Sequence, residues 1–321
     1  MKRIPPWLSL LVMAPLMGEI VSGHQPPLEL FNPLSVLLLM LPYGLGALIC
    51  RELVLRWKKS WPSLILLAIA YGVYEEAIVI RSVFNPDWME LGILKPYYVL
   101  GVNWTYSEML IHFHVLISIA ASIMLVEMLY PDRRKERWLG NKGLTVCIIG
   151  LALWLPAGWM MTDFAPPVTG YILSCLAFAV LVIAACYIPV GVRAPVHKHP
   201  PHPVFFLLLG FMNMTLFFVS VYVLPEYMTP PLLLSIIGLI FLDALTLWLL
   251  LRWSGNGAGW NDWHRLAWVS GGLGFFILYN ISSDMEAFTG RSIVSALTIV
   301  GLILISARVK HYTRNKALQL P

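Results

Sequence analysis

The sequence predicts an all-α fold: a polytopic transmembrane bundle of about ten helices, forming one integral membrane domain over residues 1–321. Two features of the composition support this prediction. Hydrophobic residues make up 59% of the chain and charged residues only 12%, whereas soluble domains have about 45–50% and about 25%. The mean hydropathy is +0.75. This composition excludes a soluble enzyme, a disordered protein and a secreted disulfide scaffold.

The third feature is a series of apolar runs of nearly the length that a span requires, about 20 residues for a hydrocarbon core about 30 Å thick. The first run follows Lys2 and Arg3, a pattern that also fits a cleaved signal peptide. In that case nine spans would remain. The runs cover residues 6–21, 34–50, 61–83, 103–130, 144–161, 169–190, 203–223, 231–251, 266–281 and 292–307.

The basic residues predict the orientation of the bundle. If both termini are cytoplasmic, 19 of the 22 Lys and Arg residues fall in cytoplasmic segments, as the positive-inside rule requires. The exceptions are Arg81, Lys95 and Arg291. We expect the basic segment 308–321 to be a cytoplasmic tail that contacts lipid headgroups. The charge lies in short connections, so nucleic acid is not an expected partner, and the plasma membrane is the expected location.

The longest outer connection, residues 84–102, is predicted to form an outer loop or a re-entrant cap. It contains Trp88, Tyr97 and Tyr98, and such amphipathic rings settle at the membrane–water interface. The segment is therefore expected to lie on the outer surface of the bundle.

Ionisable residues inside spans are costly, about 2.5–3.5 kcal/mol each on insertion scales, so they indicate a site. The unusual ionisable side chains of this sequence lie within two neighbouring spans, the third and the fourth. Glu76 and His112 are each about eight or nine residues from the outer end of their span, which at 1.5 Å per residue places both about 12–14 Å deep. One outward-opening pocket is therefore predicted. The third span carries Glu75, Glu76 and Arg81, and the fourth carries Glu108, His112 and His114.

Helix geometry predicts which of these groups face the pocket. Glu108 and His112 are four residues apart and share a helix face. His114 lies about 200° round the helix from His112 and is expected to face a different neighbour. Glu75 and Glu76 diverge by about 100°, so one of them is expected in the pocket. Further contributors are Asn280 and Asp284, which we prefer, and more weakly Asp243, Asn213 and Thr215.

A carboxylate pair beside an imidazole can activate water or bind a divalent metal. A divalent metal such as zinc is the candidate cofactor, and its candidate ligands are His112, His114 and Glu76. The same groups can relay protons in a carrier. The structural alternative is a buried network that locks the helices together, with Arg81 neutralising one glutamate.

The segment Gly72-Val73-Tyr74-Glu75-Glu76, followed by Arg81, resembles the first motif of the CAAX-prenyl endopeptidase and bacteriocin-processing (CPBP) superfamily of intramembrane proteases. The resemblance implies a polytopic helical fold in which a glutamate pair and histidines on later spans activate water for peptide hydrolysis. It makes Glu75 or Glu76 the general base and His112 the histidine that orients water or stabilises an oxyanion. Arg81 follows Glu76 by five residues instead of the family's four, and the third motif is absent.

Three functions remain open from the sequence. The first is a CPBP-like intramembrane hydrolase that acts on a membrane peptide or a lipid-linked substrate at the outer leaflet, with Glu75, Glu76, His112, Glu108 and Arg81 at its centre. The second is a proton-coupled transporter or channel for a small solute that uses the same cluster. The third is a noncatalytic membrane scaffold, in which the polar cluster binds a partner helix.

Overall fold

The computed structural model describes residues 4–28, 32–190, 199–228, 230–254 and 259–318. The basic residues Lys2, Arg3, Arg193 and Lys198, and the last three residues of the predicted tail, lie outside the described residues. Within them the fold is the predicted all-α polytopic bundle. In the part of the chain that the structure describes, nine helices are long and apolar enough to cross a membrane: Pro33–Arg56, Trp61–Val79, Trp104–Leu129, Asn141–Met161, Val168–Tyr187, Pro203–Tyr227, Leu232–Ser254, Asp262–Glu286 and Arg291–Asn315.

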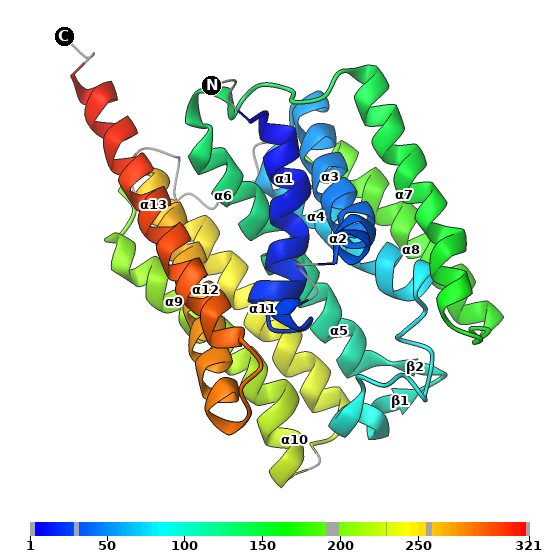
Figure 1. Cartoon of the computed structure of the whole chain (residues 1–321). Coiled ribbons are helices and arrows are strands. Elements are labelled where there is room, and N and C mark those ends of the chain that lie inside the picture. The colour runs from blue at the N-terminus through cyan, green and yellow to red at the C-terminus, as the bar shows by residue number, and fades with distance from the viewer. Residues whose placement is uncertain (1–3, 29–31, 191–198, 229, 255–258, 319–321) are drawn as a thin grey trace.

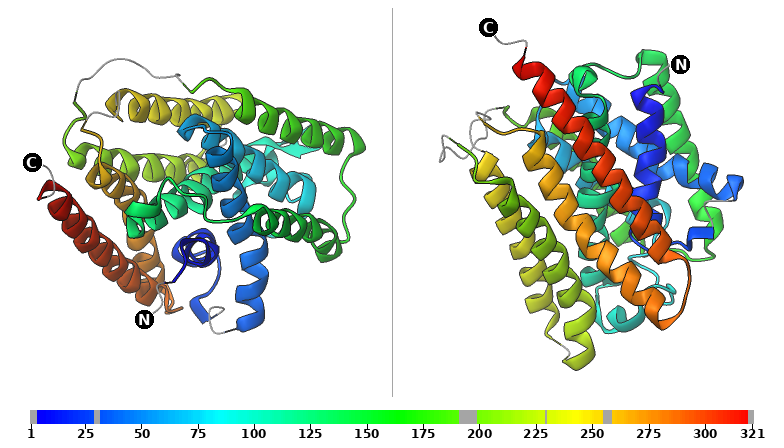
Figure 2. Two further views of the ribbon diagram at one scale, coloured as in Figure 1. Left: turned by 90° about the horizontal axis from the view of Figure 1, so that it is seen from above. Right: turned by 60° about the vertical axis from the view of Figure 1, so that its left-hand side comes forward.

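The first predicted span forms a shorter apolar helix, Pro6–Val21. At 1.5 Å per residue it is about 24 Å long, less than the about 30 Å hydrocarbon core. It is nevertheless part of the packed bundle, because Leu10 and Ala14 are completely buried. It sits between α3 (Leu45–Arg56) on one side and α12 (Asp262–Glu286) with α13 (Arg291–Ala317) on the other (Figure 2).

Five of the spans combine α-helical and π-helical segments. The wider π turn inserts an extra residue and is frequent at functional sites. In chain order the elements of these spans are α1 (Pro6–Pro15) and η1 (Leu16–Val21); α2 (Pro33–Leu39), η3 (Met40–Gly44) and α3; α4 (Trp61–Val73) and η4 (Tyr74–Val79); α5 (Trp104–Phe113), η6 (His114–Ala121) and α6 (Ser122–Leu129); and α9 (Pro203–Phe218), η8 (Val219–Val223) and α10 (Leu224–Tyr227).

The remaining spans are continuous: α7 (Asn141–Met161), α8 (Val168–Tyr187), α11 (Leu232–Ser254), α12 and α13. α1 begins and α13 ends at the same end of the bundle, which we call the terminal end (Figure 1). The outward surfaces of α7, α8, α11 and α13 expose large apolar side chains. Such surfaces are suited to contact with lipid acyl chains.

Residues 84–102 form a compact cap at the opposite end, which we call the cap end (Figure 1). The cap contains the 3₁₀ helix η5 (Gly92–Tyr97) and an antiparallel pair, β1 (Tyr98–Val99) and β2 (Val102–Asn103). Asn103 ties it to the bundle, because its side chain donates to the Leu94 carbonyl and caps the first turn of α5. Leu91 and Leu94 of the cap are buried against the bundle.

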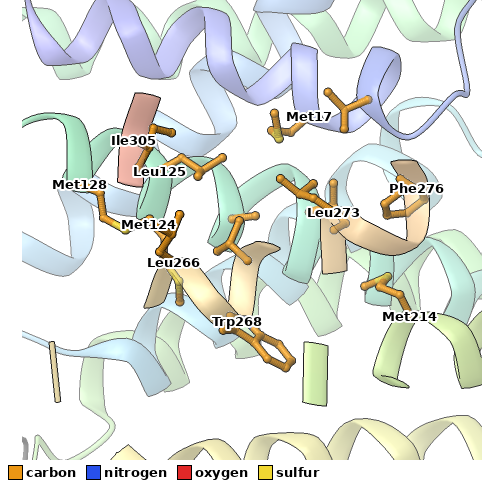
Figure 3. Close-up of a cluster of buried hydrophobic side chains, with 14 of the residues drawn as sticks. Met17, Met124, Leu125, Met128, Met214, Leu266, Trp268, Leu273, Phe276 and Ile305 are labelled. Atoms are coloured by element: carbon orange, nitrogen blue, oxygen red, sulfur yellow. The ribbon is translucent and has the colours of Figure 1, made fainter. Parts of the chain in front are cut away.

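The core between α1–η1, α6, α9, α12 and α13 is rich in methionine, including Met17, Met124, Met128 and Met214 (Figure 3). Flexible thioether side chains fill irregular gaps between helices that meet at different angles.

A charged network closes the terminal end of the bundle. Arg51 is only 3% exposed and donates to Glu127 and to the backbone carbonyls of Arg134 and Glu136. Its guanidinium also lies over the Trp138 ring. The sequence predicts Arg51 to be a charge in a connection. In the structure it instead holds together α3, α6 and the connection that follows α6.

Small residues bring α9 and α12 into close contact. A Cβ atom at Gly210 would collide with the Trp268 carbonyl, and one at Gly271 with the Leu207 carbonyl. Glycines at such positions allow helix backbones in membranes to approach closely.

We expect Gly210→Val to destabilise the bundle by about 1–3 kcal/mol, the usual cost of overpacking a well-packed core. Gly238→Val on α11 is the matched control, because a Cβ there meets no atom within 4 Å. The measurement is thermal unfolding of the purified proteins in detergent. Equal melting temperatures for the two variants would contradict the close α9–α12 contact.

Candidate functional site

The centre of the candidate site is a hydrogen bond between Glu76 and His114. Glu76 lies in η4 and His114 is the first residue of η6, and His114 Nε2 is 2.9 Å from Glu76 Oε1. Gly72, one turn before Glu76, packs against Ile111 and the Cβ of His114. The two spans therefore lie close together at the level of the pair.

Both partners of the pair are held by a second hydrogen bond. The Ser82 hydroxyl donates to Glu76 Oε2 at 2.6 Å, and Ser118 Oγ lies 3.3 Å from His114 Nδ1. With the Ser118 hydroxyl donating, Nδ1 is the acceptor of the neutral ring and Nε2–H donates to Glu76. His114 is buried, whereas the Glu76 side chain remains 13% exposed. The carboxylate is therefore the accessible member of the pair.

A chain of polar side chains leads from the pair toward the cap end. The Tyr43 ring packs 5.8 Å from that of His114, and its hydroxyl faces Glu19. Glu19 Oε2 lies 3.9 Å from His24 Nε2, and His24 lies 3.3 Å from Glu90 of the cap. His24 is 43% exposed. The chain therefore connects the buried pair with the solvent at the cap end.

The His24–Glu90 pair lies outside the spanning segments. The hydrogen bond to Glu90 raises the pKa of His24 to about 9, against the opposing effect of partial burial. Burial acts to raise the pKa of Glu90, but its hydrogen bond and charge interaction with His24 leave that pKa below the ordinary value. At neutral pH the mouth of the polar chain is therefore an imidazolium–carboxylate pair.

The structure corrects the predicted role of His112. It does not face Glu75 or Glu76. Its Nδ1 lies 2.6 Å from Oδ1 of Asp243 on α11, and its ring stacks on Phe217 at 3.7 Å. The two histidines do point to different neighbours, as their spacing predicts, but it is His114 that meets a glutamate. Spacing defines the angle between two side chains and not which of them faces a given helix.

Glu108 belongs to the same second cluster, since its carboxyl is within hydrogen-bonding reach of Asp243. From the sequence, Asn280 and Asp284 are the preferred further contributors and Asp243 a weaker one. Asn280 instead donates to the Val21 carbonyl, and Asp284 accepts from Thr289 and Ser292 at the end of α12. The signal that could have found Asp243 was its position at the middle of an otherwise apolar span.

Glu75 and Arg81 both face α7 and not the Glu76–His114 pair. Glu75 accepts a hydrogen bond from Trp154 Nε1 at 3.0 Å. Arg81, with a φ of 63°, donates to Thr162 Oγ1 and to the Phe164 carbonyl just beyond α7, and also to the carbonyls of Gly158 and Trp159 in the last turn of α7. These carbonyls have no partners within the helix. Arg81 thus caps α7, and the expected neutralisation of a glutamate by Arg81 is wrong.

The donor set does not fit a catalytic zinc ion. Such ions take three protein ligands, whereas Glu76 and His114 supply two and His112 lies in the other cluster. Within the described residues, no three His, Cys, Asp or Glu side chains are placed to hold a metal ion. The chemistry of the site is therefore derived from its own acid and base groups.

A model of an uncharacterized membrane protein family matches residues 8–229. The chain belongs to this family. The match includes Glu76, His114 and the helix that supplies Glu19, and it ends before Asp243. Neither a curated protein nor a solved structure matches the chain. Membership of this family and the nine long apolar helices together make the chain an integral, multi-pass membrane protein in contact with membrane lipids.

Arg81→Gln is expected to lower stability by about 2–3 kcal/mol, because buried carbonyls at the end of α7 would lose a charged donor. Arg133→Gln is the matched control: its pair with Glu136 is exposed on both sides and exposed pairs contribute little. Thermal unfolding in detergent distinguishes the two variants. Loss of activity in Arg81→Gln without loss of stability would show instead that Arg81 takes part in the chemistry.

The His24–Glu90 pair gives this family member a pH-dependent contribution to stability. Because the pKa of His24 is raised and that of Glu90 is lowered in the folded protein, the contribution is fully present between about pH 4.5 and 6.5. It is lost as the pH rises through about 9, and also in acid as Glu90 is protonated. Its size is about 0.5 kcal/mol, since both groups are partly exposed. The measurement is the difference in unfolding free energy between wild type and His24→Gln at several pH values. In a Glu90→Gln background this difference should vanish.

Proposed function

We propose that the protein is an intramembrane hydrolase in which Glu76 is the general base and His114 positions it. The observation that supports this proposal most directly is the 2.9 Å hydrogen bond between Glu76 and a buried His114, with the glutamate still partly exposed. A general base must be within hydrogen-bonding reach of the water it deprotonates, and Glu76 is the accessible member of the pair.

The proposed reaction uses the protein's own groups. Glu76 takes a proton from water as the oxygen attacks the carbonyl carbon of the substrate, and then returns the proton to the leaving group. Ser82 and His114 hold the two carboxylate oxygens, which fixes the direction of the remaining lone pairs. His114 Nε2–H stabilises the negative charge of Glu76 before the reaction and is a donor near the developing oxyanion.

One further observation favours a site with access from one end of the bundle. The polar chain runs from Glu76 to His24 and Glu90 at the cap end. Toward the terminal end the same helices bury apolar side chains, among them Ile119, Ile123 and Val126. A hydrolase needs one entrance for substrate and water, whereas a carrier needs access from both sides in turn.

The resemblance of Gly72–Glu76 to the first CPBP motif also supports hydrolysis, with His114 and not His112 as the histidine partner. A proton-coupled carrier is the second candidate, favoured by the chain of titratable groups from His24 through Glu19 to Glu76. It predicts proton uptake by proteoliposomes on addition of a solute, which the hydrolase does not.

The test uses two pairs of neighbouring residues as matched controls. Purified protein in proteoliposomes is screened with quenched fluorogenic membrane peptides and with acyl esters. We expect Glu76→Gln to lower turnover by about 10²-fold or more, the usual contribution of a general base. His114→Asn should lower it as well. Glu75→Gln and His112→Asn, whose side chains face α7 and α11, should retain most of the activity if they fold.

Full activity of Glu76→Gln, or equal losses in His112→Asn and His114→Asn, would contradict the proposed site. Because the donor set does not fit a metal ion, turnover is also expected to persist after treatment with EDTA. If neither turnover nor proton uptake is found with folded wild-type protein, the scaffold function predicted as the third alternative stands in its place.

A further inference from the structure

A large cavity of the bundle lies next to the polar chain. It has a volume of about 590 Å³ and is bounded by the turn after η1, the cap, α5, α9–η8 and α12. This volume falls within the range of about 300–1,000 Å³ that is typical of small-molecule sites. The cavity shares His24 and Glu90 with the polar chain, so its mouth is also the entrance of the proposed active site.

The inner wall of the cavity is almost entirely apolar. It is built mainly from aromatic and methionine side chains, of which Phe113, Met214, Phe217, Phe218, Phe275 and Phe276 are representative. Phe113 directly precedes His114, and the centroids of their rings are 6.4 Å apart. The cavity wall and His114 therefore adjoin each other on one span, and Glu76 contacts His114 from a neighbouring span.

The walls indicate a hydrocarbon chain and not a peptide. Most of the lining belongs to helices, whose backbone groups are bonded within the helix. An extended peptide would carry an N–H and a C=O at every residue, and burying them without partners costs several kcal/mol. A hydrocarbon chain brings no polar groups and gains from the burial of its apolar surface.

The polar groups at the entrance of the cavity indicate which head group a bound hydrocarbon chain would carry. Two buried acceptors near it have no hydrogen-bond donor among the described residues: Oε2 of Glu19 and Oδ1 of Asn280. Glu19 lies 3.9 Å from His24, and Asn280 packs against Gly23, which lines the cavity. Neither of these residues lines the cavity itself. An acceptor that does is the carboxylate of Glu90, whose side chain is 36% exposed, and hydroxyl groups of a ligand can donate to it.

From these observations we propose that the cavity binds a single-chain lipid with a neutral, hydroxyl-bearing head, of the monoacylglycerol type. The chain lies among the aromatic side chains, and the head donates to the Glu90 carboxylate at the mouth. An anionic head is disfavoured because the cation that lines the mouth, His24, is already paired with Glu90.

This inference rests on the proposed function in one respect, that the ligand is taken to be its substrate. Hydrolysis would then add one water across the acyl ester. The new bond joins the water oxygen to the acyl carbon, the acyl C–O bond to glycerol breaks, and the proton of the water passes through Glu76 to the released alcohol. The products are a fatty acid and glycerol, and no oxidant or other reactant is required.

The test is photo-crosslinking of the full-length protein in nanodiscs with a monoacylglycerol that carries a diazirine in its acyl chain, followed by peptide mapping. Crosslinks are expected on α5, α9 and α12 at the cavity. Leu110→Trp, which fills the cavity, should reduce them by about tenfold. The matched control is Leu151→Trp, which fills a separate apolar pocket of about 360 Å³ between α3, α4, α7 and α8. It should leave them unchanged.

Competition identifies the class of ligand. Unlabelled monoolein should displace the probe at a concentration about tenfold lower than oleate, because one or two hydrogen bonds of the head are worth about that ratio. Equal competition by oleate, stronger competition by a hydrophobic peptide, or crosslinks spread evenly over the lipid-facing helices would each overturn the proposal. Thermal unfolding confirms that both Trp variants are folded, and Met214→Trp serves as a second cavity-filling variant.

Glu76→Gln separates this inference from the proposed function. The variant is expected to be crosslinked like the wild type, because the cavity walls do not contain Glu76. Normal crosslinking without any ester turnover by the wild type would leave the lipid site standing and overturn the hydrolase. Ester turnover without crosslinks at the cavity would leave the hydrolase standing and overturn the lipid site.

Discussion

An ionisable side chain inside a bundle surrounded by lipid must find its hydrogen-bond partner on another helix of the same bundle, because acyl chains offer none. This constraint organises the spans of the present protein. Glu76 meets His114, Asp243 meets His112, and Glu75 meets Trp154. Each pair joins two different spans, so the polar groups that could carry chemistry also determine how the helices are placed against one another.

The π-helical segments are part of the same arrangement. Four of them carry side chains of the polar chain: Glu19 in η1, Tyr43 in η3, Glu76 in η4 and His114 in η6. A π turn shifts the side chains that follow it round the helix axis. A regular period predicted that His112 and His114 face different neighbours, but which of the two meets a glutamate depends on the adjacent helices.

Much of the fold could be predicted from the sequence, and less of the site. The lengths of the apolar runs predict about ten spans, since only a helix can satisfy its backbone while crossing a membrane. The described residues contain nine helices of sufficient length and the shorter helix Pro6–Val21. The involvement of the third and fourth spans followed from the cost of burying Glu76 and His114 in lipid. The choice of His112 as the pocket histidine was wrong, and so was the preference for Asn280 over Asp243, because both depended on which helices become neighbours.

The sequence by itself determined that the chain is a helical membrane bundle and which few side chains are too polar for their surroundings. Hydropathy and charge are local properties, and a window of about 20 residues is enough to measure them. The tertiary structure decided that these side chains form two clusters and not one, that Arg81 caps α7, and that an aromatic cavity of about 590 Å³ adjoins the polar chain. Such features depend on the packing of helices far apart in the sequence, which no local pattern specifies.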